Sequence, residues 1–306
     1  MTAESWKLVA TAPKPVVQAA LAAHERLADW DQDIVLTGGE VAEDRPDDWR
    51  LEAYLPRRPR KADRAAVAGL FRDGAPALAA EKLPDTDWVV ETQRQVAPIR
   101  AGRFHVHTRD YPALEEPGVV DFTIPAAQAF GTGQHATTAG CLAMLDAMKR
   151  RGAVVRNMAD IGTGTGLLAF AALALWPRAR AIASDIDPVC APVVAENAAL
   201  NGISLAGGAR GGHGRLAMVV AEGMDHPLLA ARAPYDLLAA NILAGPLVGL
   251  AGDFSDAVAP GGSLLLAGLL TTQESAVRAA YRTAGFRLAA RMERGDWSIL
   301  WLRRRP

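Results

Sequence analysis

Residues 157–166 read Asn-Met-Ala-Asp-Ile-Gly-Thr-Gly-Thr-Gly, and this stretch decides the fold of the larger part of the chain. An apolar approach ends at Asp160, three glycines follow at alternate positions, and a strongly helix-forming run begins at Leu167. A second apolar segment, 182–187, ends in acidic residues. Strand, glycine turn, helix and acid-tipped strand together indicate a nucleotide-binding βαβ unit.

The spacing of the glycines distinguishes between classes of nucleotide. In the dinucleotide fingerprint G-x-G-x-x-G, a turn that starts with Gly162 and Gly164 has its third glycine at position 167. That position holds Leu167, and the third glycine is Gly166. The pattern is therefore G-x-G-x-G, the methyltransferase form, and a dehydrogenase is disfavoured.

Three polar side chains strengthen this weak signal. Asp160 immediately precedes the turn, where we expect it to organise the turn and the amino-acid moiety of the cofactor. Asp185 ends the second strand and can accept hydrogen bonds from both ribose hydroxyls, while Asp187 can cap the following helix instead. Asn241 ends the fourth strand. Ligands of open α/β sheets gather outside the carboxyl ends of strands, so we expect these residues to converge.

The second half of the chain alternates strands with helices, which predicts a parallel sheet covered on both faces. We expect strands near residues 156–161, 180–185, 216–221, 235–240, 263–267, 286–292 and 297–302, and helices near 166–176, 188–201, 244–258 and 272–284. The last two strands should form a hairpin that adds an antiparallel edge. The glycine-rich run 204–214 is interpreted as a surface loop.

The first 90 or so residues predict a smaller domain of the ferredoxin-like class. The expected order is β-α-β-β-α-β, with strands at 5–10, 34–36, 49–55 and 88–92 and helices at 14–27 and 62–80. We therefore divide the chain into a ferredoxin-like domain (1–92), a linker (93–128) and a catalytic domain (129–306). Four prolines break regular structure in the linker.

Composition narrows the class of protein further. The 306 residues are 50% apolar and 22% charged with a net charge of −1, so neither nucleic acid nor an anionic membrane is favoured as a partner. Only Cys141 and Cys190 are present, which suits a reducing compartment. Neither a secretory signal nor a membrane span is recognisable, so we expect a cytoplasmic protein.

Two other features offer weaker functional readings. His105 and His107 share one face of a predicted strand at 103–108, but no third ligand lies at a useful spacing, so partly exposed histidines and no metal are expected. The run 55–61 contains four cations. It is interpreted as a solvated turn before a helix, with contact to RNA or an acidic partner as the alternative.

The chain resembles the PrmA family, the S-adenosylmethionine-dependent methyltransferases of large-subunit ribosomal protein eleven. The resemblance rests on the glycine turn and Asp185, on Asn-Ile-Leu-Ala-Gly-Pro-Leu at 241–247, and on Ala-Phe-Gly-Thr-Gly-Gln-His at 129–135. It covers about residues 86–303 and includes Val-Ala-Pro-Ile-Arg at 96–100. It implies a class I methyltransferase fold with a mostly parallel seven-stranded sheet, behind a ferredoxin-like substrate-recognition domain.

Carried over by position, the resemblance implies cofactor contacts at Thr138, Gly162, Asp185 and Asn241, beside Asp160, Gly164 and Gly166 of the turn itself. The sequence departs from the family at Ala136, where a proline is usual, and at 125–128, where Pro-Ala-Ala-Gln replaces an ending in Pro-Gly. Thr138 is the contact that these departures affect.

The expected reaction is methylation of lysine side chains or of the N-terminal amine of a large-subunit ribosomal protein, free or ribosome-bound. The sulfonium methyl is already activated, so catalysis is mostly alignment of a neutral amine. Asn241 is the candidate proton or hydrogen-bond acceptor, Phe130 and Thr132 are candidates to line the acceptor channel, and His135 is an alternative base.

Other functions remain open at this stage. A different protein lysine is a plausible target. Enzymes that methylate glutamine or nucleic acid commonly place Asn-Pro-Pro-aromatic after the fourth strand, whereas Ile242, Leu243 and Ala244 follow Asn241 here. Nucleic acid is therefore not expected as a direct substrate. A non-catalytic binding module is disfavoured because Asp160, Asp185 and Asn241 are all present.

Overall fold

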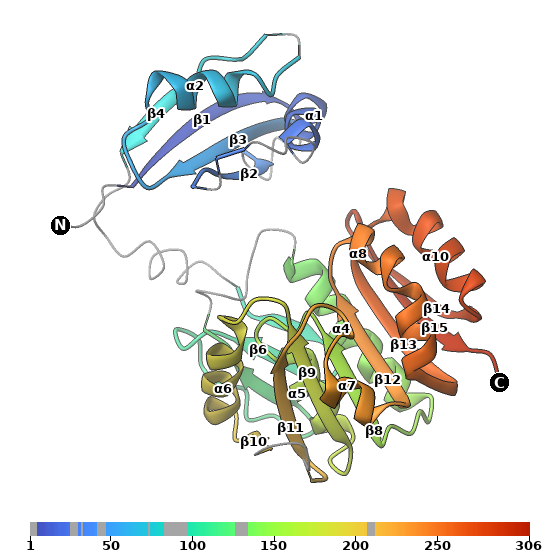
Figure 1. Ribbon diagram of the computed structural model, residues 1–306. Coiled ribbons are helices and arrows are strands. Elements are labelled where there is room, and N and C mark those ends of the chain that lie inside the picture. Colours follow the sequence, from blue (N-terminus) through green and yellow to red (C-terminus); the bar gives the residue numbers. More distant parts are fainter. Residues whose placement is uncertain are drawn as a thin grey trace. The chain divides into compact units, whose positions relative to one another are not determined.

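The computed structural model describes residues 5–24, 30–31, 33–41, 47–72, 74–82, 97–125, 134–206 and 212–306, without the side chains of residues 134 and 135. The chain divides into two compact units, Met1–Glu91 and Thr92–Pro306 (Figure 1). Each unit is built around its own hydrophobic core. Among the described helices, none combines the length and the apolar character needed to cross a membrane.

The smaller unit is a four-stranded sheet with two helices. Its elements are β1 (Trp6–Pro13), α1 (Lys14–His24), β2 (Val35–Glu40), β3 (Asp48–Leu55), α2 (Lys61–Ala68) and β4 (Ala79–Lys82). The strand order is β2-β3-β1-β4 and every neighbouring pair is antiparallel. This is the split βαβ arrangement of the ferredoxin-like class, as the order of elements predicted.

The basic run 55–61 is partly engaged inside this unit. The guanidinium of Arg57 forms ion pairs with Asp31 at 2.7 Å and with Asp63 at 3.0 Å. Arg58 lies over the ring of Trp6, 5.4 Å from its centroid. Two of the four cations, Arg57 and Arg58, therefore fasten the turn before α2 to other residues of the smaller unit.

The predicted second helix, 62–80, is wrong in its second half. Helix α2 ends at Ala68, and the fourth strand is β4, which occupies the end of the predicted helix. Gly69, Gly74 and Pro76 explain the early end, because glycine and proline are the poorest helix formers. The strand predicted at 88–92 lies outside the described residues.

The larger unit contains an eight-stranded sheet and a small second sheet. Its strands are β5 (Ile99–Ala101), β6 (Phe104–His107), β7 (Val120–Thr123), β8 (Asn157–Ile161), β9 (Arg180–Asp185), β10 (Ser204–Leu205), β11 (Arg215–Val220), β12 (Tyr235–Asn241), β13 (Val258–Leu270), β14 (Phe286–Arg294) and β15 (Trp297–Arg304). Its helices are α4 (Gln134–Arg150), α5 (Leu167–Leu175), α6 (Cys190–Leu200), α7 (Pro227–Arg232), α8 (Ala244–Gly249), α9 (Ala251–Ala257), η2 (Thr271–Gln273) and α10 (Glu274–Thr283).

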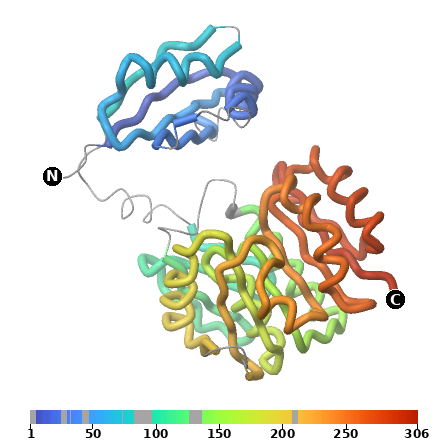
Figure 2. Tube along the Cα trace, viewed as in Figure 1, coloured from blue at the N-terminus to red at the C-terminus, as the bar shows by residue number. Residues whose placement is uncertain are grey.

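The large sheet has the order β10-β11-β9-β8-β12-β13-β15-β14, and all pairs are parallel except the two that involve β15. The trace in Figure 2 ends in the C-terminal hairpin, coloured red. The expected parallel sheet with an antiparallel edge is confirmed. An eighth strand, the two-residue β10, joins the seven expected ones at the start of the predicted surface loop.

Alternate residues of the central strands enter separate cores on the two faces of this sheet. On β8, Met158 packs with helices α4, α5 and α6, whereas Ala159 packs with helices α7 to α10. On β12, Leu237 and Leu238 alternate in the same way. This alternation is what the period of two in a strand requires when both faces are buried.

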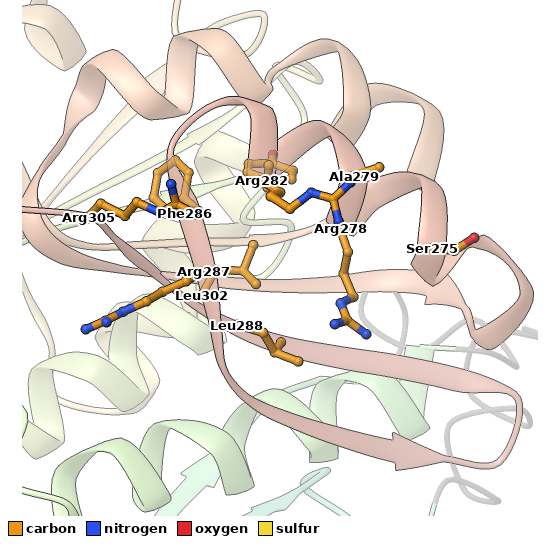
Figure 3. Close-up of a pocket in the computed structure, with 10 residues that line it drawn as sticks. Ser275, Arg278, Ala279, Arg282, Phe286, Arg287, Leu288, Leu302 and Arg305 are labelled. Atoms are coloured by element: carbon orange, nitrogen blue, oxygen red, sulfur yellow. The ribbon is translucent and has the colours of Figure 1, made fainter.

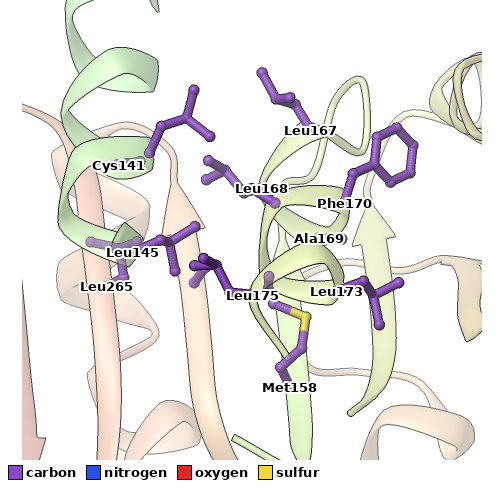
Figure 4. Packing of buried hydrophobic residues seen from close by; sticks show 14 of the residues in the cluster. Cys141, Leu145, Met158, Leu167, Leu168, Ala169, Phe170, Leu173, Leu175 and Leu265 are labelled. Atoms are coloured by element: carbon purple, nitrogen blue, oxygen red, sulfur yellow. The ribbon is translucent and has the colours of Figure 1, made fainter. Parts of the chain in front are cut away.

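Helix α5 is buried almost all round, as its apolar sequence predicts. It packs on strands β8 and β9 of the sheet and beside α4, where Cys141 and Leu145 face Leu168 and Leu175 (Figure 4). A helix with no polar face cannot lie at the surface, so α5 fixes the glycine turn that precedes it inside the core.

Two further differences concern helices of the larger unit. The helix predicted at 244–258 is divided into α8 and α9 at Leu250, in a run interrupted by glycines. Helix α7 was not foreseen, because its six residues are too few to show a helical period. It begins with Pro227, behind a cap in which the His226 ring accepts the N–H of Leu228.

The predicted linker is largely structured within the larger unit. Strands β5, β6 and β7 form a three-stranded sheet, and Phe104, Val106 and Phe122 belong to the same core as α4 and α5. The prolines mark the turns between these strands and do not indicate an extended spacer. The physical reason is the alternating apolar side chains of 99–106 and 120–124, which need a core to cover them.

Asn201, at the end of α6, fastens β7 to the main body. Its Oδ1 accepts the N–H of Thr123 at 2.8 Å, and its Nδ2 donates to the carbonyl of the same residue at 2.9 Å. The side chain thus supplies both hydrogen bonds that a neighbouring strand would otherwise give.

We predict that Asn201→Ala lowers the free energy of unfolding by about 1–3 kcal/mol, because it leaves the N–H and the carbonyl of Thr123 unpaired. Leu200→Ala is the control on the same helix; Leu200 is 40% exposed, and a change of at most about 0.5 kcal/mol is expected. Urea denaturation measures both. Equal values for the two variants would contradict the role assigned to Asn201.

Candidate functional site

Three adjacent strands end together at one edge of the large sheet. Strand β8 lies between β9 and β12, with Ile161 opposite Ser184 on one side and Ala240 on the other. Asp160, Asp185 and Asn241 share the alternation phase of the residues that face α4 and α5. The polar side chains identified in the sequence are therefore brought to one edge and one face.

The turn after β8 is built from glycines in the left-handed region. Gly162, Gly164 and Gly166 have φ values of 69°, 54° and 86°, which L side chains rarely adopt. A Cβ on Gly162 would lie 2.2 Å from the side chain of Ile242, and one on Gly166 would lie 2.7 Å from the ring of Phe170. A Cβ on Gly164 would meet nothing within 4 Å. Gly164 therefore borders open space.

Asp160 is a charged residue in an apolar core. It is 1% exposed, and its Oδ2 accepts hydrogen bonds from the Thr163 hydroxyl at 2.6 Å and from the Ala169 N–H at 3.2 Å. Its Oδ1 has no partner among the described residues. Burial raises the pKa of Asp160 to about 6, despite the two hydrogen bonds, and the neighbouring Asp185 adds to the rise.

Asp185 connects the first two strand ends. Its Oδ2 accepts the N–H of Gly164 at 2.8 Å, and its Oδ1 accepts the N–H of Asp187 at 3.1 Å. The Cys190 thiol also hydrogen-bonds this carboxylate. A carboxylate offers about four lone pairs, so it can still accept from a ligand. Asp187 has the other expected role, since its Oδ1 accepts the N–H of Val189 at the start of α6.

Asn241 is held in place through its neighbour Ile242. A Cβ on Gly268, whose φ is +81°, would lie 2.3 Å from the carbonyl oxygen of Ile242, and the side chain of Ile242 fills the space above Gly162. Ile242 is thus clamped between two glycines. The half-buried side chain of Asn241 has no hydrogen-bond partner among the described residues.

Gly268 was not singled out from the sequence. Its importance depends on contact with the backbone of Ile242, far away along the chain, and only its position inside an apolar run hints at a close approach. Asn197 was also missed; this buried side chain donates from Nδ2 to the carbonyl of Thr165 and secures the turn against α6.

Helix α4 brings Thr138 to the same region. Cys141, one turn further along α4, is buried, and burial together with the charge of Asp160 raises the pKa of its thiol. Residues three apart share a helix face, so half-buried Thr138 lies on the side of α4 that looks toward the glycine turn. Phe130 and Thr132 lie outside the described residues, and so does the side chain of His135.

A separate pocket lies at the edge of the large sheet that β14 forms. It has a volume of about 390 Å³ and is bordered by α10, β14 and β15 (Figure 3). Four arginines line it: Arg278, Arg282, Arg287 and Arg305. Arg278 is paired with Glu274 at 3.1 Å. The pocket includes no residue of the glycine turn, so it is distinct from the site at the strand ends.

The expectation of partly exposed histidines at positions 105 and 107 is wrong. His105 is 6% and His107 5% exposed, so both are buried. The pairing of β6 with β7 also places Asp121 directly beside His105. The sequence does not show this neighbour, which comes from another strand.

The titration of Asp160 gives a test of its burial. The folded-state pKa lies above the value of about 3.9 for an unfolded chain, so the native protein holds a proton that the unfolded chain loses. Between about pH 4 and about pH 6 this group therefore makes the free energy of unfolding fall as the pH rises.

We predict that Asp160→Asn, which keeps an acceptor for Thr163 and Ala169 but has no charge, is spared this loss. From about pH 4 to about pH 7 the wild type should lose up to about 2–3 kcal/mol relative to the variant. Urea denaturation of both proteins without ligand measures the difference. A difference that stays constant with pH would mean that Asp160 is not the titrating group.

Comparison with known proteins gives one consistent result. The model of the family described as "Ribosomal protein L11 methyltransferase (PrmA)" matches residues 17–305. The ribosomal protein L11 methyltransferase of Agrobacterium fabrum is 38% identical over 277 residues, 90% of each chain. That of Brucella suis is 40% identical over 223 residues, 73% of this chain and 74% of the relative.

A solved structure agrees with these relatives. The crystal structure of a ribosomal protein L11 methylase from Lactobacillus delbrueckii subsp. bulgaricus is 28% identical, with a TM-score of 0.53. The matched region covers 69% of this chain and 99% of the Lactobacillus chain. The fold is therefore that of a class I S-adenosylmethionine-dependent methyltransferase, and the chain belongs to the ribosomal protein L11 methyltransferase family, PrmA.

Proposed function

We propose that this protein transfers methyl groups from S-adenosylmethionine to amines of ribosomal protein L11, at lysine side chains, at the N-terminal amine or at both. The observation that carries the proposal is the gathering of Asp160, Asp185 and Asn241 around the glycine turn in a chain of this family. A reaction on a ribosomal protein, free or on the ribosome, places the enzyme in the cytoplasm.

The residues at the strand ends fit the cofactor. Asp160 Oδ1 is a buried acceptor without a partner among the described residues, suited to the amino-acid moiety of S-adenosylmethionine. Gly164 leaves open space for a close approach to the backbone. Asp185 accepts two backbone N–H groups and the Cys190 thiol, and its remaining lone-pair capacity suits the ribose hydroxyls. Thr138 would complete the site from α4.

When bound, the cofactor supplies a methyl group already activated on a sulfonium. The protein must then present a neutral amine. Deprotonating an exposed lysine at about pH 7 costs about 4–5 kcal/mol, since its ordinary pKa is near 10.4. The site can lower this cost by excluding water, and the proton leaves to solvent before the transfer. The role we assign to Asn241 Oδ1 is to accept a hydrogen bond from the neutral amine and so orient its lone pair toward the methyl group.

Phe130 and Thr132 are proposed to line the path of the acceptor amine, on the strength of their place in the Gly-Thr-Gly loop before α4. Asn241 is an acceptor and not a strong base, so alignment and desolvation contribute most of the rate. Methylation of a lysine in a different protein uses the same chemistry and is the second candidate.

Methylation of glutamine or of nucleic acid is less well supported. A planar amide or base is commonly clamped by the aromatic side chain of an Asn-Pro-Pro-aromatic run after the fourth strand. Here Ile242 and Leu243 take the proline positions and Ala244 takes the aromatic one. Ile242 is held between Gly162 and Gly268 and so is occupied in packing. Leu243 is 71% exposed and offers no planar surface for stacking.

We predict that Gly164→Ala weakens S-adenosylmethionine binding at least about tenfold, because the new methyl group fills the space reserved for the cofactor. Gly152→Ala is a matched control. Gly152 also has a positive φ, of 80°, and open space around a Cβ, but it lies in the turn after α4.

Both glycine variants should cost about 1–2 kcal/mol of stability through left-handed strain. Only Gly164→Ala should lose affinity in isothermal titration calorimetry. If Gly152→Ala weakens the binding equally, the loss is due to stability and the site is not at the turn.

The activity is tested with purified ribosomal protein L11 and S-adenosylmethionine, followed by peptide mass spectrometry. We predict added methyl groups on lysine or on the N-terminal amine. Asn241→Ala should reduce kcat by about 10- to 100-fold while the cofactor Kd changes less, because the lost hydrogen bond acts on the reacting amine. Methyl groups found only on RNA or on glutamine would reject the proposal.

A further inference from the structure

A cluster of His105, His107 and Asp121 lies apart from the proposed catalytic residues. Strands β6 and β7 run parallel, and their register pairs His105 with Asp121 and His107 with Thr123. One ligand atom from each of the three side chains lies within 4.8 Å of the others. The opposite face of β6, with Phe104 and Val106, packs into the core, so the strand holds the two histidines firmly.

The hydrogen bonds around His107 fix which of its nitrogens carries a proton. Nδ1 lies 2.7 Å from the carbonyl oxygen of Thr108, which can only accept, so Nδ1 must be the donor. In the neutral ring Nε2 is then unprotonated, and its lone pair points at Asp121 Oδ2, 2.9 Å away. Two acceptors cannot face each other at that distance, so either a proton on Nε2 or a metal ion lies between them.

The second histidine, His105, also contacts the carboxylate of Asp121. His105 Nδ1 lies 2.6 Å from Asp121 Oδ1, which also accepts the N–H of Leu114 at 3.0 Å. The two imidazole rings are stacked, with centroids 5.1 Å apart.

We propose that His105, His107 and Asp121 bind a zinc ion that ties β6 to β7. Two imidazoles and a carboxylate are ordinary ligands of Zn²⁺. The bond from His107 Nδ1 to a backbone carbonyl is the outer contact that orients metal-bound histidines and leaves Nε2 for the metal. The Thr123 hydroxyl, 3.4 Å from His107 Nε2, or a water completes the tetrahedron.

Binding a zinc ion requires the ligand atoms to move. Zinc bonds of about 2.0–2.1 Å hold tetrahedral ligand atoms about 3.3 Å apart. The separations of 2.6 and 2.9 Å, which involve different oxygens of Asp121, would therefore open, and wider separations within the 4.8 Å limit would close. The zinc site takes no part in methyl transfer. Its effect would be to stabilise the three-stranded sheet β5-β6-β7.

The test uses the full-length chain without an affinity tag, stripped with a chelator and titrated with Zn²⁺ by calorimetry. We expect about one zinc ion per chain in elemental analysis and a raised Tm when zinc is present. His107→Gln and Asp121→Asn should lose this binding. His213→Gln, which changes an exposed histidine before β11, should retain it.

Wild-type protein with no saturable zinc binding would overturn the proposal, and would mean that His107 carries a proton on Nε2 instead. Zinc binding that persists in folded Asp121→Asn would place the metal elsewhere and also overturn it. Because variants of buried histidines can misfold, Co²⁺ in the wild type is a second probe. Its visible absorption should show tetrahedral nitrogen and oxygen ligation, and an octahedral spectrum would contradict the site.

Discussion

The hydrogen bond from the Gly164 N–H to Asp185 Oδ2 is the contact on which the site depends. It joins the turn after β8 to the end of β9, and it forms only because three glycines take left-handed backbone conformations. The same turn admits the side chain of Ile242 above Gly162 and thereby sets the backbone that carries Asn241. A side chain at Gly162 would displace Ile242, and one at Gly166 would displace the ring of Phe170.

The sheet contributes the second requirement, a common direction for the polar side chains. Because residues alternate between two buried faces, Asp160, Asp185 and Asn241 all lie on the side of α4 and α5. Placing Asp160 there is costly, as its raised pKa shows. An ionisable group kept in an apolar core with one free oxygen is more readily explained by a ligand than by stability.

The sequence was sufficient for most of the larger unit, because its signals are local. The glycine spacing, the acid at position 185 and the alternation of strands with helices all lie within short windows. Errors arose where a role depends on residues distant in the chain. Gly268 matters through Ile242, and Asp121 matters through the pairing of β6 with β7; neither contact leaves a local pattern.

In the smaller unit, too, the sequence predicts some features and misses others. Its order of elements follows from turn residues and periodicity, but the end of α2 at Ala68 depends on glycines that a continuous apolar pattern conceals. The prolines at 93–128 suggested a spacer, whereas residues 99–124 carry apolar side chains that the core of the larger unit takes up. Burial, and not local propensity, decides such segments.

The central claim is that the methyl donor binds where β8, β9 and β12 end. A crystal structure with S-adenosylhomocysteine tests it most directly. We predict that the ribose hydroxyls lie against the carboxylate of Asp185 and that the amino-acid moiety lies beside Gly162 and Asp160. Ligand density in the arginine-lined pocket between α10 and β14, with none at the glycine turn, would contradict it.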